Sequence, residues 1–311
     1  METGIVTEST GSRYIILTPD GRRLETRLRG RLRLNGSRTT NPVAVGDRVL
    51  YEETPEGVHK DRNGGLWFVE PRRNYLIRRA SNLSKESHVI ASNLDRALLV
   101  ATLFSPVTNT EFIDRFLVTC EAYAIPAAIV LNKLDLAAER PDELDEFIAI
   151  YETAGYTVYP VSATEGTGLE TLRELTAGKT TLLTGNSGAG KSTLIKALVP
   201  DADVRINRIS EYHHKGMHTT TFARMYPLAG GGNIIDTPGI KGFGLVDIEP
   251  GEVFRYFPEF MRHSPDCQYY NCTHTHEPGC AVTAAVERGD IAPQRYISYI
   301  KLLDEDGKYR Q

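Results

Sequence analysis

An eight-residue segment, Gly185–Ser192 with the sequence GNSGAGKS, restricts the possible folds of this chain more than any other. Its first glycine, four intervening residues and Gly-Lys-Ser ending form the phosphate-loop pattern. After Lys179, residues 180–184 are apolar or β-branched, so residues 179–184 predict a buried strand, and residues 192–199 predict a helix. In that setting the glycines let backbone N–H groups surround a phosphate, and the helix N-terminus favours negative charge. A chance glycine-rich turn is not expected to have both flanking elements, so we predict a nucleotide phosphate site.

This loop and the helix after it supply the expected phosphate and metal contacts. Lys191 is expected to reach the β- and γ-phosphates, and the Ser192 hydroxyl to coordinate the Mg²⁺ that accompanies the nucleotide. The residues of this segment expected to contact the nucleotide are Gly185, Asn186, Ser187, Gly188, Ala189, Gly190, Lys191, Ser192 and Thr193.

A guanine-reading motif, Asn132-Lys-Leu-Asp135, directly follows a predicted strand at 126–131. The Asp135 carboxylate can accept from both guanine N1–H and the 2-amino group, whereas adenine would leave it unpaired, and a buried unpaired group makes such discrimination large. We expect Asn132 to contact N7 and the stem of Lys133 to pack on the base. The tetrapeptide alone is also compatible with an ordinary strand-to-helix turn capped by Asp135.

A second base-reading element, Ser162-Ala163, follows a predicted strand at 157–161. The dipeptide carries no information by itself. One strand–helix–strand unit after Asn132–Asp135, however, it is where the Ala163 N–H could meet guanine O6.

The segment Asp236-Thr-Pro-Gly239 follows a further short predicted strand. An Asp-x-x-Gly sequence in this position places Asp236 near Mg²⁺ through water and the Gly239 N–H at the γ-phosphate. A threonine upstream would complete the metal shell; we favour Thr220, with Thr219 and Thr221 left open. Taken alone, Asp236–Gly239 could be a plain turn, but four motifs in one compatible order make coincidence negligible.

The order of these motifs is unusual, because the two base-reading elements precede the phosphate loop. Common GTPases have the phosphate loop first. The same parallel α/β sheet can be built from a circularly permuted chain, since the termini of a domain often lie close together. The sequence therefore predicts a circularly permuted P-loop GTPase domain.

The first 73 residues predict a small β-barrel that fits an OB-fold, because several short strands follow one another between turns. In residues 24–34 leucines and arginines alternate, so a strand there would bury a leucine face and expose an arginine face. Residues 1–80 hold 15 Lys and Arg against 10 Asp and Glu, a net charge of +5 in a chain of net charge −4. These arginines predict an RNA-binding face. Tyr14, Trp67 and Phe68 could stack on bases, but we favour core positions for all three. Residues 74–92 are polar and predicted to be a connection.

Three cysteines near the C-terminus, Cys267, Cys272 and Cys280, predict a metal site. Three thiolates and one imidazole suit tetrahedral Zn²⁺, and four protein ligands leave no position for a substrate water, so the site would be structural. His263, His274 and His276 are all candidates for the fourth ligand. Helical segments flank the cluster, and so small a region is expected to need its metal to fold. Cys120 lies on an amphipathic helix face and is expected in the core.

With this permuted order and this cysteine spacing, the chain resembles the ribosome small-subunit-dependent GTPase A family of bacterial assembly factors over its whole length. The resemblance implies an OB-fold domain at 1–73, a permuted GTPase domain at 74–245 and a small helical zinc domain at 246–311. It also implies His274 as the fourth zinc ligand. Ile240 follows Gly239, where Ras-like enzymes have a water-positioning glutamine. The family is thought to use a switch-region histidine, so we expect His218 to be catalytic; the alternative is an ordinary loop histidine.

The resemblance further implies a GTPase that binds the small ribosomal subunit and its rRNA in late assembly, with GTP hydrolysis stimulated by the subunit. Expected ligands are GTP or GDP with Mg²⁺ and one structural Zn²⁺, and other small-subunit assembly factors are possible partners. The first ten residues carry no signal-peptide pattern. We expect a cytoplasmic monomer that does not enter a membrane. The alternatives are a GTP-dependent RNA enzyme, for which no second catalytic constellation is visible, and a nucleotide-regulated scaffold with negligible turnover.

Overall fold

The computed structural model describes residues 1–11, 13–28, 41–53, 64–79, 87–137, 140–204, 223–237 and 248–308. The chain divides into two compact units, each made of several separate segments. The first unit consists of Met1–Ala97, Leu169–Thr184 and Lys191–Gly244, and the second of Leu98–Gly168, Gly185–Gly190 and Leu245–Gln311. The predicted domain boundaries at 73 and 245 stay predictions.

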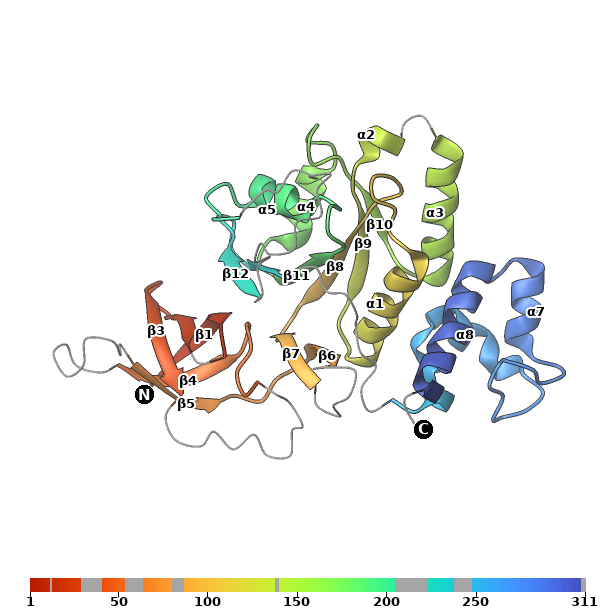
Figure 1. The fold of residues 1–311 in the computed structure, drawn as a ribbon, viewed down its shortest axis with the longest axis horizontal. Coiled ribbons are helices and arrows are strands. Elements are labelled where there is room, and N and C mark those ends of the chain that lie inside the picture. The colour runs from red at the N-terminus through yellow and green to blue at the C-terminus, as the bar shows by residue number, and fades with distance from the viewer. Residues whose placement is uncertain are drawn as a thin grey trace. The chain divides into compact units, whose positions relative to one another are not determined.

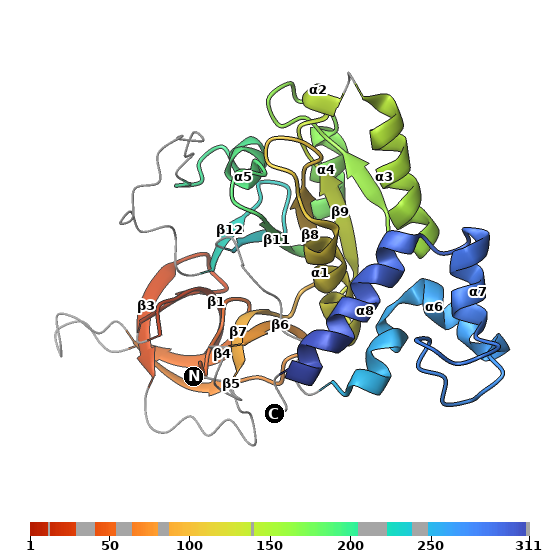
Figure 2. The same ribbon diagram turned by 45° about the vertical axis from the view of Figure 1, so that its right-hand side comes forward.

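The N-terminal part of the first unit is a closed five-stranded barrel (Figures 1 and 2). Its strands are β1 (Glu2–Ser9), β2 (Tyr14–Leu17), β3 (Arg23–Leu28), β4 (Arg48–Glu53) and β5 (Gly64–Val69). Each strand pairs with two others in the circuit β1–β2–β3–β5–β4–β1, and only β3 and β5 run parallel. This five-stranded closure is that of an OB-fold, so the predicted fold is confirmed.

Inward-facing residues of the barrel strands and the adjoining Val43 form its core, which consists of Val6, Tyr14, Ile16, Val43, Val49, Tyr51 and Leu66. The predicted alternation holds where β3 is described, because Leu28 packs against this core and Arg27 is exposed. Residues 29–34, the rest of that predicted strand, lie outside the described residues. The core position expected for Tyr14 is confirmed, but the one expected for Trp67 and Phe68 is wrong, since these side chains are 40% and 49% exposed.

The remainder of the first unit is a hairpin and a small α/β layer. Strands β6 (Tyr75–Arg79) and β7 (Ser87–Ser92) pair antiparallel, in a region that the sequence predicted to be a connection. Strand β11 (Thr180–Gly185) runs parallel to β13 (Asn233–Asp236), which pairs antiparallel with β12 (Arg224–Pro227). Helices α4 (Leu169–Thr176) and α5 (Lys191–Leu198) flank β11 in the sequence. Strand, loop and helix thus follow one another as predicted.

The barrel meets this α/β layer at one antiparallel step. Glu8 on β1 is the register partner of Arg224 on β12. The Arg224 Nε also donates to Glu8 Oε1 at 2.8 Å, and Arg23 of β3 pairs with the same carboxylate. One acidic side chain therefore links two barrel strands to the strand that follows the expected switch threonines.

The second unit begins with the rest of the α/β fold. Its strands follow the order β10-β9-β8, with β8 at Arg96–Ala101, β9 at Ala127–Leu131 and β10 at Val158–Pro160. Strands β9 and β10 are parallel, as a nucleotide-binding α/β domain requires. Its helices are α1 (Thr110–Ala122), α2 (Leu134–Ala137) and α3 (Pro141–Ala154). Asn109 caps α1 by accepting from Glu111 N at 2.8 Å, and Cys120 is fully buried in this helix, as predicted.

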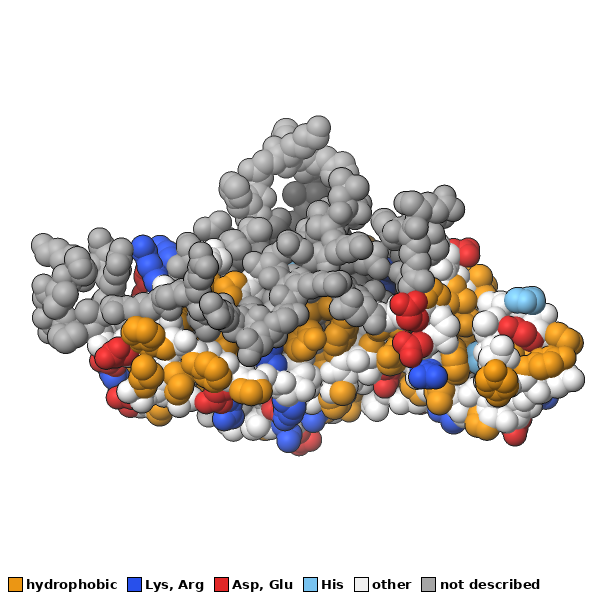
Figure 3. Space-filling model, turned by 90° about the horizontal axis from the view of Figure 1, so that it is seen from below, with side chains coloured by type: hydrophobic (Ala, Val, Ile, Leu, Met, Phe, Trp, Pro, Cys, Tyr) orange, Lys and Arg blue, Asp and Glu red, His pale blue; other side chains and the backbone are white. Residues whose placement is uncertain are grey.

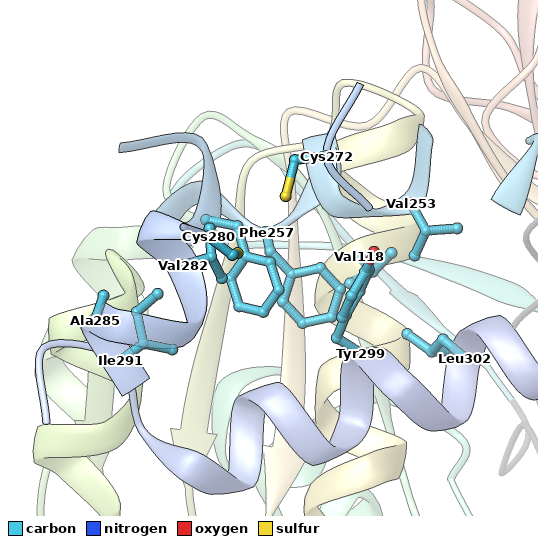
Figure 4. Close-up of a cluster of buried hydrophobic side chains, with 11 residues drawn as sticks. Val118, Val253, Phe257, Cys272, Cys280, Val282, Ala285, Ile291, Tyr299 and Leu302 are labelled. Atoms are coloured by element: carbon cyan, nitrogen blue, oxygen red, sulfur yellow. The ribbon is translucent and has the colours of Figure 1, made fainter. Parts of the chain in front are cut away.

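The C-terminal part of the second unit is helical. It contains the 3₁₀ helices η1 (Pro250–Tyr256) and η2 (Ser264–Asp266) and the helices α6 (Pro258–His263), α7 (Ala281–Arg288) and α8 (Pro293–Lys308). Its core combines aromatic rings with Cys272, Cys280 and Val118 of α1 (Figure 4). None of the helices in the described ranges has the length and apolar character needed to cross a membrane.

A buried charged cluster joins α1 to this C-terminal part. The Arg295 guanidinium of α8 donates to Asp114 Oδ1 of α1 at 2.7 Å. It also donates through Nε to Glu259 Oε1 of α6 at 2.6 Å. All three side chains are essentially inaccessible, and the guanidinium lies 4.7 Å from the centre of the Phe257 ring. Three helices therefore share one desolvated ionic contact.

Candidate nucleotide and metal sites

The phosphate loop lies where its glycines are sterically required. A Cβ atom on Gly185 would lie 2.4 Å from the Val100 carbonyl oxygen, and one on Gly190 would lie 2.2 Å from Asn132 Nδ2. Gly190 also has a φ of +90°, which favours glycine. Both positions therefore exclude any larger residue, for reasons independent of a bound phosphate.

Asn132 ties the phosphate loop to the second base-reading element. Its Nδ2 donates to the Ala189 carbonyl at 2.8 Å, and its Oδ1 accepts from the Ala163 N–H at 3.1 Å. Three segments that are far apart in the sequence therefore meet at one buried amide. The contacts expected from Asn132 to N7 and from Ala163 to O6 stay predictions. In the structure the Asn132 amide and the Ala163 N–H are hydrogen-bonded to each other.

Asp135 is held in place by Ser162. The Ser162 hydroxyl donates to Asp135 Oδ1 at 2.6 Å, which leaves the carboxylate with further acceptor positions for a base edge. Neighbouring Lys133 has a left-handed backbone with φ +64°. Burial lowers the pKa of the Lys133 ammonium, while the nearby Asp135 carboxylate opposes that shift.

One segment of this site was not predicted from the sequence, the loop Thr102–Thr108 between β8 and α1. The Lys133 ammonium donates to the Ser105 carbonyl, and Pro106 lies 3.2 Å from where a Cβ on Gly188 would be. The Thr108 hydroxyl accepts from Thr102 N at 2.9 Å and closes the loop on itself. The signal was available, because loops at the carboxyl ends of parallel strands line the ligand site of such sheets.

In the first unit, Lys191 and Asp236 form the candidate phosphate and metal contacts. Lys191 Nζ lies 3.2 Å from Asp236 Oδ1 and donates to the Thr237 carbonyl at 2.6 Å. Asp236 ends β13 beside Leu183 of β11, so its carboxylate is at the carboxyl edge of two parallel strands. Burial raises the pKa of Asp236, and the Lys191 ammonium opposes that shift. Ser192 and Thr193 lie in the first turn of α5.

Three residues predicted for catalysis and switching lie outside the described residues. They are His218, Thr220 and Gly239. Their roles stay predictions.

The structure brings the four predicted zinc ligands together. One ligand atom from each of Cys267, Cys272, His274 and Cys280 lies within 4.8 Å of all the others. The His274 Nδ1 is 3.4 Å from Cys280 Sγ and 3.6 Å from Cys267 Sγ. Tetrahedral zinc with ordinary Zn–S and Zn–N bonds separates such atoms by about 3.6 Å, so the donor set fits this metal. Of the three candidate histidines, His274 is the one in the cluster.

The environment of the sulfurs also suits a cation. Backbone N–H groups of Ala281 and Thr283, at the start of α7, donate to Cys267 Sγ at 3.3 Å and to Cys280 Sγ at 3.4 Å. Burial tends to raise the pKa of Cys280, but hydrogen bonds from the Thr283 N–H and hydroxyl have the opposite and larger effect, so the pKa of this thiol is lowered. Burial, together with the neighbouring Cys280, raises the pKa of Cys272 to about 12. Thiols crowded this closely release their protons more readily to a shared metal.

Glu277, which was not predicted from the sequence, shapes the turn of the metal cluster. Its carboxylate accepts from Thr273 N at 2.8 Å and from Thr275 N at 3.1 Å. Burial would raise the pKa of Glu277, but the Thr273 hydroxyl and backbone bonds bring it far below its usual range. Nothing in the sequence pointed to this carboxylate.

Sequence profiles of two protein-family domains match this chain. Residues 69–246 match the RsgA GTPase domain, and residues 3–58 match the RsgA N-terminal domain. The first match covers the β-hairpin, both base-reading motifs, the phosphate loop and Asp236, and the second covers most of the barrel.

Relatives match over nearly the full chain. The Small ribosomal subunit biogenesis GTPase RsgA 2 of Bacteroides thetaiotaomicron is 51% identical, over 99% of this chain and 98% of the relative. The Small ribosomal subunit biogenesis GTPase RsgA of Porphyromonas gingivalis is also 51% identical, with the same coverage.

Two solved structures share the fold. The crystal structure of YjeQ from Thermotoga maritima matches with a TM-score of 0.75 and 33% identity, covering 98% of each chain. YloQ, described as a circularly permuted GTPase, matches with a TM-score of 0.73 and 29% identity over 100% of this chain and 96% of that one. From the permuted motif order, the meeting of both base-reading elements at Asn132 and these matches, we conclude that the chain belongs to the RsgA GTPase family.

Proposed function

We propose that this protein is a GTPase that binds the small ribosomal subunit and acts in its late assembly, hydrolysing GTP to GDP and phosphate when the subunit stimulates it. The observation that carries the nucleotide part is the Asn132 side chain, which bonds both Ala189 of the phosphate loop and Ala163 of the base-reading loop. A ligand that spans the two loops has a base at one end and phosphates at the other. The subunit enters through the relatives, whose names describe small-subunit biogenesis.

The residues assign separate roles along the nucleotide. Asp135, oriented by Ser162, accepts from the guanine edge, and Lys133 covers the base with its stem. The N–H groups of residues 185–190 and the Lys191 ammonium bind the phosphates. The Lys191 ammonium donates one hydrogen bond to the Thr237 carbonyl and keeps further N–H donors for the phosphates. Ser192 would hold Mg²⁺ directly and Asp236 through water, and the ion would supply positive charge to the phosphates.

We further propose one structural Zn²⁺ held by Cys267, Cys272, His274 and Cys280. The protein would work as a cytoplasmic monomer with three domains at 1–73, 74–245 and 246–311. The basic barrel and the zinc domain would contact rRNA, and other assembly factors would be further partners.

Purified small ribosomal subunits are expected to raise GTP turnover by this protein at least tenfold, and large subunits are expected to leave it unchanged. The reason is that Ile240 cannot orient water, so the catalytic arrangement is incomplete until a partner orders it. Phosphate release is measured with each subunit at equal concentration. Stimulation by neither subunit would contradict the proposal and favour a guanine-nucleotide-regulated scaffold.

A His218→Ala variant is expected to lose about 10²-fold or more of the stimulated turnover while it still binds GTP. A residue that orients or deprotonates the attacking water acts on the chemical step and not on ground-state binding. The matched control is His213→Ala, which removes another histidine of the same segment. Full stimulated turnover by His218→Ala would rule out the catalytic role and leave His218 an ordinary loop residue.

A further inference from the structure

Two neighbouring aromatic residues on β5, Trp67 and Phe68, both face outward from the barrel. Successive residues of a regular strand point to opposite faces. Here Leu50 is the register partner of Phe68 and Tyr51 that of Leu66, so Trp67 is an extra residue in the strand. Such a β-bulge turns two consecutive side chains to the same side. The exposed fractions of 40% and 49% follow from this bulge.

An arginine flanks this aromatic pair on each neighbouring strand. Arg27 of β3 is the register partner of Gly65, which places it diagonally from Trp67. Arg48 of β4 is two residues before Leu50, the partner of Phe68. Diagonal neighbours of this kind lie about 7–8 Å apart, within reach of long side chains.

The two arginines are available to a ligand. Both are exposed, and neither forms an ion pair within the described part of the chain, whereas Arg13, Arg22 and Arg23 each pair with an acid. Acidic side chains share this surface: Glu52 is the partner of Gly65, and Glu25 lies two residues before Arg27 on β3, where it pairs with Arg13. Figure 3 shows the corresponding mixture at the barrel end, with hydrophobic side chains at the surface among basic and acidic ones.

We propose that Trp67 and Phe68 are a stacking platform for unpaired RNA bases, with Arg27 and Arg48 bound to the adjoining phosphates. Exposed aromatic rings between guanidinium groups match the alternation of base and phosphate along a single strand. A double helix keeps its bases stacked on each other and offers no free ring face. This inference rests on the proposed binding of small-subunit rRNA and specifies which RNA structure the barrel takes.

Trp67 makes a direct measurement possible, because it is the one tryptophan of the chain. A single-stranded RNA of about ten nucleotides, within the site size of an OB-fold, is titrated into the full-length protein at low salt. Stacking is expected to quench the Trp67 fluorescence in a saturable way. A duplex of the same sequence is expected to bind, if at all, with little quenching. Equal quenching by both RNAs, or none by either, overturns the proposal.

Truncation of the platform side chains tests how much they contribute to the affinity for single-stranded RNA. Phe68→Ala is expected to weaken binding of the single strand between about fivefold and about a hundredfold, as followed by Trp67 quenching. Trp67→Ala is expected to do the same when binding is followed with fluorescently labelled RNA, and Trp67→Phe to recover most of it. The matched control is Leu136→Ala, which removes an exposed apolar side chain outside both the barrel and the zinc domain. All four substitutions are at the surface, and thermal unfolding verifies that each variant is folded.

The two proposals fail in different ways. If small subunits stimulate the wild-type protein and bind Trp67→Ala and Phe68→Ala equally well, the platform is wrong and the proposed function stands. If the variants bind subunits more weakly but single-stranded RNA never quenches Trp67, the platform contacts a ribosomal protein, which also overturns the assignment to RNA bases. If wild-type protein responds to no subunit, the proposed function fails, whatever the short RNA does.

Discussion

Replacing Asp135 with asparagine is expected to weaken GTP binding by about 10²- to 10⁴-fold. Asp135 would accept two hydrogen bonds from guanine, and bonds to a charged group are worth about 1.5–3 kcal/mol each. An asparagine presents an N–H₂ group where one of the guanine donors arrives. The same group can donate to the 2-oxo group of xanthine, so the affinity for XTP is expected to rise. Equilibrium titration with fluorescent GTP and XTP analogues measures both changes.

The matched control for this change is Ser162→Ala. Ser162 orients Asp135 through a 2.6 Å hydrogen bond without being expected to touch the base. Its loss should cost about 1 kcal/mol, or roughly fivefold in affinity, without a change in base preference. Unchanged GTP affinity in Asp135→Asn would mean that Asp135 caps the turn after β9 and does not read guanine.

Removal of the metal, by a chelator or by Cys280→Ser, is expected to unfold the C-terminal part of the second unit. Metal binding by structural sites of this kind contributes about 10–16 kcal/mol at neutral pH, which is comparable to the whole stability of an ordinary domain, about 5–15 kcal/mol. The loss of structure should extend beyond the metal cluster, because Cys272 and Cys280 belong to the same core as Phe257, Phe260 and Tyr299. Metal content together with hydrogen exchange over residues 248–308 measures it, and one zinc per wild-type chain is expected.

Cys120→Ser controls for the loss of a buried thiol. Cys120 is fully buried in α1 and lies outside the metal cluster, so this variant should keep its zinc and lose only the modest stability of a core substitution. A Cys280→Ser protein that retains normal zinc content and normal protection from exchange would show that the cluster does not hold the metal.

The motifs of the nucleotide site could be predicted from the sequence because each one depends on a short run of residues at the end of a strand. Their mutual contacts could not. Nothing in the sequence indicates that the Asn132 amide would reach both Ala189 and Ala163, since these contacts depend on how three loops meet. The Thr102–Thr108 loop has no motif, and only its place after a strand indicates it; its contact through the Ser105 backbone carbonyl could not be predicted.

The barrel shows where residue periodicity is a reliable guide and where it is not. Arg27 and Leu28 lie on the predicted faces because β3 is regular there. Trp67 and Phe68 were predicted in the core, since large aromatic residues in a short apolar run usually are. One extra residue opposite Leu50 and Tyr51 reverses the outcome, and a bulge leaves no signature in single-sequence patterns.

The Arg295 cluster has a consequence for how the two nucleotide states could differ. Separating a buried guanidinium from its carboxylates leaves uncompensated charge, at a cost of about 3–5 kcal/mol. Helices α6 and α8 are bound in this way to Asp114 in α1, the helix that starts directly after the Thr102–Thr108 loop. Sliding the metal-binding region over α1 is therefore energetically unfavourable, because it would break these buried ion pairs. If GTP and GDP place that region differently, α1 has to travel with it as a single rigid body, and the hinge has to lie elsewhere in the chain.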